Sequence, residues 1–281
     1  MKEMHVKNRL ECIRKSLFVL GAAISFFCMA SSAYCGINVS PTTVELVVAT
    51  GADSKGQFSI VNPTDEQVHV KVEAEDWLKQ KMGKSGVALE KWLTIQPIEF
   101  DLGPKTAQNV EYTINVPKGQ TGELVAMVFF ATSSLQGNMN IVSRIGSSIY
   151  AAIGDTITLA CNIKKIRAVK NILKQENGST VDKGAIFNIN VENKGNVHIR
   201  PTGRIVVTGQ DKATYTVPIE RGFPVYPGAN LDYAVLWDKT DIAPGKYEGT
   251  IELDYGNIYN VDKKLVKKIR FEVKKNGTIS S

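Results

Sequence analysis

Apolar and polar residues alternate along much of the chain after residue 36. Over residues 68–75 every second position is Val or Ala, and His, Lys or Glu stand between them. A period of two is typical of a β-strand with one face in a core and the other in water. Residues 185–191 repeat this alternation, and no stretch after residue 36 keeps the period of 3.6 that marks an amphipathic helix. The pattern therefore predicts an all-β chain.

Short β-type runs, separated by Gly, Pro and Asn, continue to the C-terminus. Many short strands at this spacing are typical of β-sandwiches. Pro41 interrupts the first run, as expected of an edge strand that changes sheet. The sequence predicts two immunoglobulin-like β-sandwich domains, at 36–154 and 155–275, and a tail at 276–281. The expected strands are 37–39, 44–48, 56–61, 68–74, 92–95, 98–102, 107–116, 123–131 and 139–153, then 163–173, 185–191, 203–208, 214–219, 231–236, 245–253 and 266–273.

The N-terminus has the three-part pattern of a secretory signal peptide. An apolar run at 17–30 follows a basic head and precedes small residues up to Ala33. The run is short for a membrane span, so we predict a signal peptide over 1–35, with an uncleaved anchor as the alternative. Cleavage after Ala33 and cleavage after Cys35 both fit, and Tyr34 disfavours lipidation of Cys35. We therefore expect a periplasmic protein or, alternatively, a cell-surface protein.

The net charge bears on whether the chain binds nucleic acid, and the cysteine content on whether it forms a disulfide. The chain has 34 Lys and Arg against 28 Asp and Glu, and residues 1–35 hold five and two of these, which leaves 29 against 26. A net charge of +3 on the remainder does not predict nucleic-acid binding. Of four cysteines only Cys161 lies beyond residue 35. We expect a buried thiol there, with a Cys35–Cys161 disulfide as the alternative if Cys35 is retained.

No catalytic motif stands out in the chain. After residue 36 the histidines are His69, on the polar side of its predicted strand, and His198, just after a turn. Neither has a second histidine or a cysteine at metal-ligand spacing. Nucleophile elbows, phosphate loops and dinucleotide fingerprints do not occur. The sequence thus predicts a protein that is not an enzyme and that has no cofactor and no metal.

Five segments of the first predicted domain follow one another in a suggestive order and spacing. They are INVSPT at 37–42, FSIVN at 58–62, WLTIQP at 92–97, FDLGP at 100–104 and SRIGSSIY at 143–150. With these segments, residues 36–153 resemble the N-terminal domain of the PapD-like periplasmic pilus chaperones. The second domain resembles that family only as another immunoglobulin-type module. Its marks are NKGNVH at 193–198, YPG at 226–228 and PGKY at 244–247.

The resemblance implies binding by β-strand addition. In that family the last strand of the first domain supplies the strand that a pilus subunit lacks, and alternating apolar side chains fill the subunit's groove. The comparable partner-binding positions here are Met139, Ile141, Ser143 and Ile145, with Ser143 interrupting the apolar series. Ordinary sandwich core is the alternative interpretation of the same alternation.

The family also binds the subunit's terminal carboxylate with two basic residues in the cleft between the domains. The matching cleft positions here are Thr43 and Ser148, and neither is basic. The nearest cation on the last strand is Arg144. At these positions the chain departs from the family's pattern. A diverged relative that binds other exported proteins or cell-surface partners therefore fits better than an orthodox pilus chaperone.

Two functions from different classes follow. The first is a chaperone-like protein whose partners are exported subunits, pilin-like subunits included. It predicts an unpaired last strand in the first domain and an open angle between the domains. The second is a structural or adhesive module of the cell envelope, with closed sheet edges and a collinear pair of domains. Both exclude nucleic acid as a partner and involve the membrane only through the signal peptide.

Overall fold

Two β-sandwiches make up the fold of the computed structural model, which describes residues 36–77, 87–136, 139–176 and 178–281. The predicted all-β, two-sandwich fold is confirmed. The expected signal peptide, and Cys35 with it, lie outside the described residues. Helical structure in the described part is limited to the 3₁₀ turns η1 (Leu89–Lys91), η2 (Gly154–Thr156) and η3 (Asn257–Tyr259). No helix among the described residues is long and apolar enough to span a membrane.

The first sandwich has a four-stranded sheet in the order β1-β3-β7-β5 and a five-stranded sheet in the order β2-β9-β8-β4-β6. The strands are β1 (Asn38–Ser40), β2 (Thr43–Val48), β3 (Asp53–Val61), β4 (Val68–Asp76), β5 (Leu93–Gln96), β6 (Glu99–Leu102), β7 (Ala107–Asn115), β8 (Glu123–Gln136) and β9 (Met139–Ile153). The chain changes sheet between β1 and β2, at Pro41, as the proline predicted. Proline has no backbone N–H to donate to the hydrogen bonds of a sheet, so the strand is interrupted there.

The second sandwich has sheets in the orders β10-β11-β14 and β13-β12-β15-β16-β17. Its strands are β10 (Cys161–Lys174), β11 (Thr180–Asn193), β12 (Thr202–Gly209), β13 (Thr214–Ile219), β14 (Asn230–Trp237), β15 (Gly245–Asp254), β16 (Lys264–Val273) and β17 (Ile279–Ser280). Cys161 is a free thiol, and burial raises its pKa to about 12.

Each sandwich has its own hydrophobic core. Phe58 and Phe130 meet edge to face at 5.5 Å between ring centroids in the first. Phe187 stacks with Trp237 at 6.2 Å in the second. Phe58 and Phe187 come from strands on which buried positions alternate with less buried ones, so the period of two in the sequence contributes directly to both cores.

One corner recurs in both sandwiches. Asn62 follows β3 and Asn193 ends β11, and both side chains are fully buried. Asn62 Nδ2 donates to the carbonyls of Glu66 (2.7 Å) and Leu102 (3.1 Å), and Asn193 Nδ2 donates to Val197 and Val225, each at 2.8 Å. A buried amide that satisfies two carbonyls replaces the ladder bonds lost where a strand ends.

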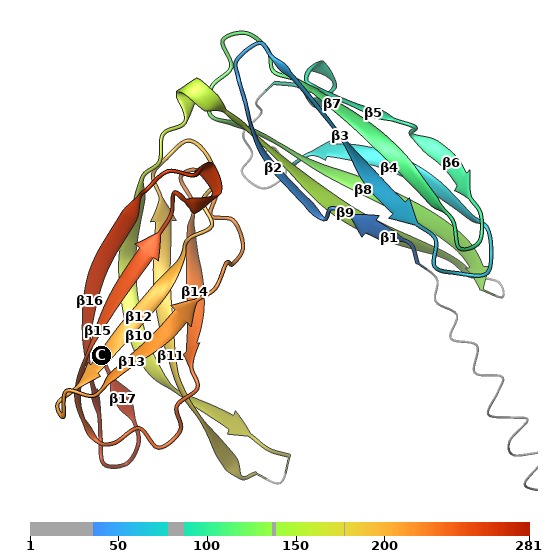
Figure 1. Ribbon diagram of the computed structural model, residues 1–281. Coiled ribbons are helices and arrows are strands. Elements are labelled where there is room, and N and C mark those ends of the chain that lie inside the picture. Colours follow the sequence, from blue (N-terminus) through green and yellow to red (C-terminus); the bar gives the residue numbers. More distant parts are fainter. Residues whose placement is uncertain (1–35, 78–86, 137–138, 177) are drawn as a thin grey trace, which may run out of the picture.

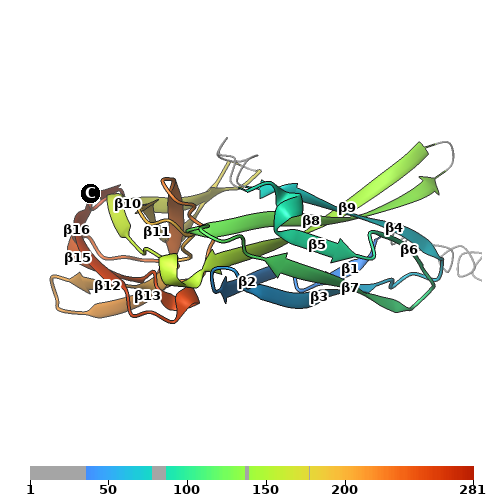
Figure 2. The same cartoon turned by 90° about the horizontal axis from the view of Figure 1, so that it is seen from above.

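The two sandwiches lie at an angle and meet at one end of each, close to η2 (Figure 1). Strand β9 leads directly into η2, and β10 begins the second domain after it. Seen from above, the hairpin of β8 and β9 reaches past the other strands of the first sandwich (Figure 2). The fold thus presents two features for function, a projecting hairpin and a junction between domains.

Candidate partner-binding edge and interdomain site

Strand β9 has one side without a strand partner over much of its length. It pairs with β8 from Met139 to Ala152. On its other side it pairs with β2, in parallel, from Ser148 to Ile153. Within the described residues, the backbone of 139–146 therefore pairs with β8 alone. Its outer edge offers unpaired N–H and C=O groups, which is what an added strand requires.

The end of the β8–β9 hairpin leaves the sandwich entirely. The ladder between β4 and β8 stops at the pair Val70 and Thr132. Beyond it, residues 133–136 of β8 and 139–142 of β9 pair only with each other among the described strands. The hairpin therefore holds part of the β9 edge clear of the body of the domain.

The predicted partner-binding residues lie along this edge. Met139 stands opposite Gln136 and Ile141 opposite Ser134, so both are on the projecting part of the hairpin. Ser143 is half-buried. Ile145, also half-buried, packs against the core of the first domain. Ile145 thus already contributes to the sandwich, and the side chains of Met139 and Ile141 lie outside the described part of the structure.

The two predicted cleft positions are direct neighbours. Thr43 on β2 stands opposite Ser148 on β9, and Ser148 Oγ donates to Thr43 Oγ1 at 3.3 Å. The pair carries no charge. Arg144, four residues before Ser148, is bound elsewhere. Its Nη2 donates to Glu73 at 3.1 Å and to Glu75 at 2.6 Å, and its guanidinium lies 3.8 Å from the centre of the Phe129 ring.

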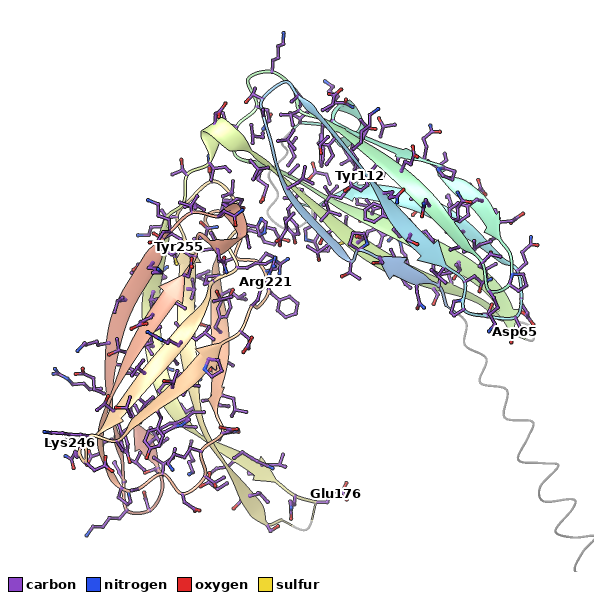
Figure 3. All side chains as sticks on the ribbon, viewed as in Figure 1. Asp65, Tyr112, Glu176, Arg221, Lys246 and Tyr255 are labelled. Atoms are coloured by element: carbon purple, nitrogen blue, oxygen red, sulfur yellow. The ribbon has the colours of Figure 1, made fainter. Side chains whose placement is uncertain are left out.

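The cations at the domain junction come from the second domain. Arg200 Nε donates to Glu45 Oε1 at 2.7 Å, and Arg221 also donates to this carboxylate. Glu45 belongs to β2 of the first domain. Burial opposes its ionisation, but the bonds from His198 and Arg221 outweigh that effect and lower the Glu45 pKa to about 2. Figure 3 shows Arg221 on the side of the second domain that faces the first.

A buried histidine sits beside this ion cluster. His198 is only 1% exposed, and its Nδ1 lies 2.5 Å from Glu123 Oε1 on β8. Its Nε2 lies 3.4 Å from Glu45 Oε1. Tyr259 Oη donates to the His198 carbonyl at 2.8 Å. Burial raises the pKa of Tyr259 far above its ordinary range, so it acts only as a hydroxyl.

Three aromatic residues complete the junction. Trp77 Nε1, just after β4, donates to Tyr226 Oη at 3.0 Å, and Tyr226 Oη lies 3.1 Å from Tyr150 Oη on β9. The Tyr150 ring packs against the His198 ring, with 4.2 Å between the ring centroids. Burial raises the pKa of Tyr226 as well. These bonds connect strands β4 and β9 of the first domain to the second domain.

Sequence reasoning did not find this junction. It placed His198 after a turn without a partner, although the segment Asn196–Arg200 contains both His198 and Arg200 within five residues. A histidine and an arginine so close together after a buried strand were the signal in the sequence that could have predicted this junction. No group of three or more His, Cys, Asp and Glu residues in the described part of the chain is arranged to hold a metal ion.

The comparisons with known proteins give a likeness of fold. No protein-family model matches the chain, and no curated protein matches it. Among solved structures, the class 5 fimbriae chaperone CfaA is 14% identical with a TM-score of 0.46, and the match covers 83% of this chain and 98% of that one. The chain resembles the PapD-like pilus chaperones.

Two further structures show the same likeness. The CupB2 chaperone of Pseudomonas aeruginosa is 10% identical with a TM-score of 0.39, over 82% of this chain and 98% of that one. The Salmonella enterica SafA pilin in complex with the SafB chaperone gives 15% identity and a TM-score of 0.39, over 84% and 96%. At these identities the likeness is one of overall fold, and it assigns no site residue in this chain.

Proposed function

We propose that this protein is a non-enzymatic, chaperone-like protein of the periplasm that holds exported subunits by β-strand addition along β9. The observation that carries the proposal is the β9 edge from 139 to 146, which has a strand partner on one side only within the described chain. The partner would be a subunit whose own sandwich lacks a strand, as in pilin-like subunits.

The edge is long enough to bind a strand. Every second residue of an edge strand directs its N–H and C=O outward, so eight residues offer about four such pairs. Each new backbone hydrogen bond adds on the order of 0.5–1.5 kcal/mol. The alternation of a β-strand would place Met139 and Ile141 on one face of this segment. They would enter the groove of the subunit while its backbone pairs with β9.

The carboxylate anchor of the family does not carry over to this chain. Thr43 and Ser148 occupy the matching positions without charge, and Arg144 is bound by two glutamates. Arg200 and Arg221 are already bound to Glu45. Pairing along β9 would therefore contribute most of the affinity, and contacts in the cleft would contribute less.

The open edge and the angled domains favour this function over a structural or adhesive envelope module. Such a module gains nothing from an exposed strand edge, which is a site of unwanted pairing unless it is protected. A hairpin that extends the unpaired edge beyond the sandwich fits a protein that presents the strand to a partner.

Co-purification from the periplasm tests the proposal. Met139→Asp/Ile141→Asp places charge on the apolar face of β9, and we expect it to abolish recovery of a stoichiometric exported partner. Val142→Asp is the matched control, because Val142 is on the opposite face and is 62% exposed. Equal loss in both variants, or no stoichiometric partner with the wild-type protein, would overturn the proposal in favour of an envelope module.

A further inference from the structure

The junction between the domains contains an imidazole enclosed by two carboxylates. His198 belongs to the second domain, whereas Glu123 on β8 and Glu45 on β2 belong to the first. Besides its ring contacts, the His198 backbone N–H donates to Glu123 Oε2 at 3.1 Å. The Glu123 side chain is 1% exposed and that of Glu45 is 17% exposed. The three groups connect the two sandwiches away from bulk water.

We propose that His198 is a pH-sensitive lock on the angle between the two domains. Both ring nitrogens face a carboxylate oxygen, at 2.5 Å for Glu123 and 3.4 Å for Glu45. A neutral imidazole has one donor and one acceptor nitrogen, and only the imidazolium donates from both. Hydrogen bonds from His198 to both first-domain carboxylates at once therefore require the protonated ring.

The other charged and titratable groups around His198 are consistent with a cation at this place. Arg200 and Arg221 bind Glu45 and leave Glu123 to be balanced by the imidazolium. Tyr150 from β9 packs against the imidazole with 4.2 Å between the ring centroids, and Tyr259 from η3 meets it in a T-shaped contact at 6.2 Å. Aromatic faces attract a desolvated cation. Without the proton, Glu123 would be a buried carboxylate without a cationic partner.

Deprotonation of His198 removes its contact with Glu45 and keeps its contact with Glu123. The remaining hydrogen stays at Nδ1, because Glu123 is the nearer and more buried acceptor. The Nε2 lone pair then faces Glu45 Oε1, so a weak attraction becomes a repulsion. Strand β2 keeps its bonds to Arg200 and Arg221, while the contact of His198 with β2 is lost. The domain angle becomes less restricted, and the two sandwiches stay folded.

The direction of the pH effect follows from the direction in which the pKa of His198 is shifted. Burial alone would lower the pKa of His198, but the bonds to Glu123 and Glu45 outweigh it and raise the pKa above the ordinary value. The lock is therefore fully closed below about pH 6.5, the pKa of an unperturbed histidine. It opens as pH rises through the raised pKa of the folded protein.

The chain offers a matched control. His69 also lies between two carboxylates, with Nδ1 2.8 Å from Asp101 and Nε2 2.8 Å from Glu99, and its pKa is raised as well. It is exposed and lies on β4 of the first domain, opposite Asp101 on β6 and away from the junction. A change in domain orientation that follows the titration of His198 and not that of His69 must come from the domain interface.

NMR on the protein from residue 36 onward tests the lock, with residual dipolar couplings measured across the pH range. We expect one alignment tensor to fit both domains at acidic pH and two tensors to be needed above the His198 titration, seen at the imidazole Cε1–H. His69→Gln should leave this response unchanged, and His198→Gln should remove it. A domain orientation that stays fixed through the titration would overturn the proposal, and so would a response that persists in His198→Gln. The wild-type titration decides the question even if His198→Gln fails to fold.

Discussion

Glu45 of the first domain and Arg200 of the second are joined by a 2.7 Å hydrogen bond between Oε1 and Nε. Both side chains are largely buried, at 17% and 12% exposure. The residues stand 155 positions apart in the sequence, so only the docking of the two sandwiches brings them together. This pair belongs to the ion cluster that joins the two domains.

Glu45→Gln should destabilise the domain junction. The change leaves the largely buried Arg200 and the half-exposed Arg221 without this counter-ion. Removing one partner of a buried ion pair costs about 3–5 kcal/mol. Urea unfolding followed by tryptophan fluorescence measures the loss. Glu73→Gln is the control, because Glu73 is exposed where it binds Arg144, and exposed pairs contribute about 0–1 kcal/mol. Equal effects of the two changes would contradict the role assigned to Glu45.

The stability that Glu45 gives to the junction should be lost in acid. The pKa of Glu45 is lowered from 4.5 to about 2, so this carboxylate contributes stability that is fully present above pH 4.5 and is lost as pH falls from there through about 2. Stability measured by urea unfolding should therefore fall less steeply with acid in Glu45→Gln than in the wild type below pH 4.5. Parallel curves for the two proteins would contradict the lowered pKa.

Each corner asparagine should stabilise its own domain. Asn193→Ala removes a fully buried amide and leaves the carbonyls of Val197 and Val225 without this donor. We expect a loss of about 2–3 kcal/mol in the unfolding free energy of the second domain. Asn190→Ala serves as control, since that amide bonds to Asp232 on the surface. Hydrogen exchange resolves which domain is affected, and a comparable loss in both variants would contradict the assignment.

The sequence predicted the strands well because alternation is a local property. Residues 68–74, read as alternating, form most of β4, and Pro41 marks the change of sheet. The 3₁₀ turn at 89–91 was not predicted, since three residues carry no periodic signal. Glu123 and His198 could not be paired from the sequence, because 75 positions separate them and no motif connects them.

The open edge of β9 could be predicted from the sequence only in part. Alternation placed Met139, Ile141, Ser143 and Ile145 on one face, but it cannot tell whether a strand has a neighbour. The short length of β2, which pairs with β9 only from Ser148 onward, leaves the edge open. That fact depends on the register of two strands that are far apart in the chain, and register is set by tertiary packing.

Hydrogen–deuterium exchange of the backbone amides of 139–146 tests the central claim most directly, measured on the protein alone and in complex with the exported partner recovered with it. Strand addition predicts that outward-facing amides of this segment exchange slowly only in the complex, while amides already bonded to β8 change little. Unchanged exchange along 139–146, with protection appearing elsewhere on the surface, would contradict binding through the β9 edge.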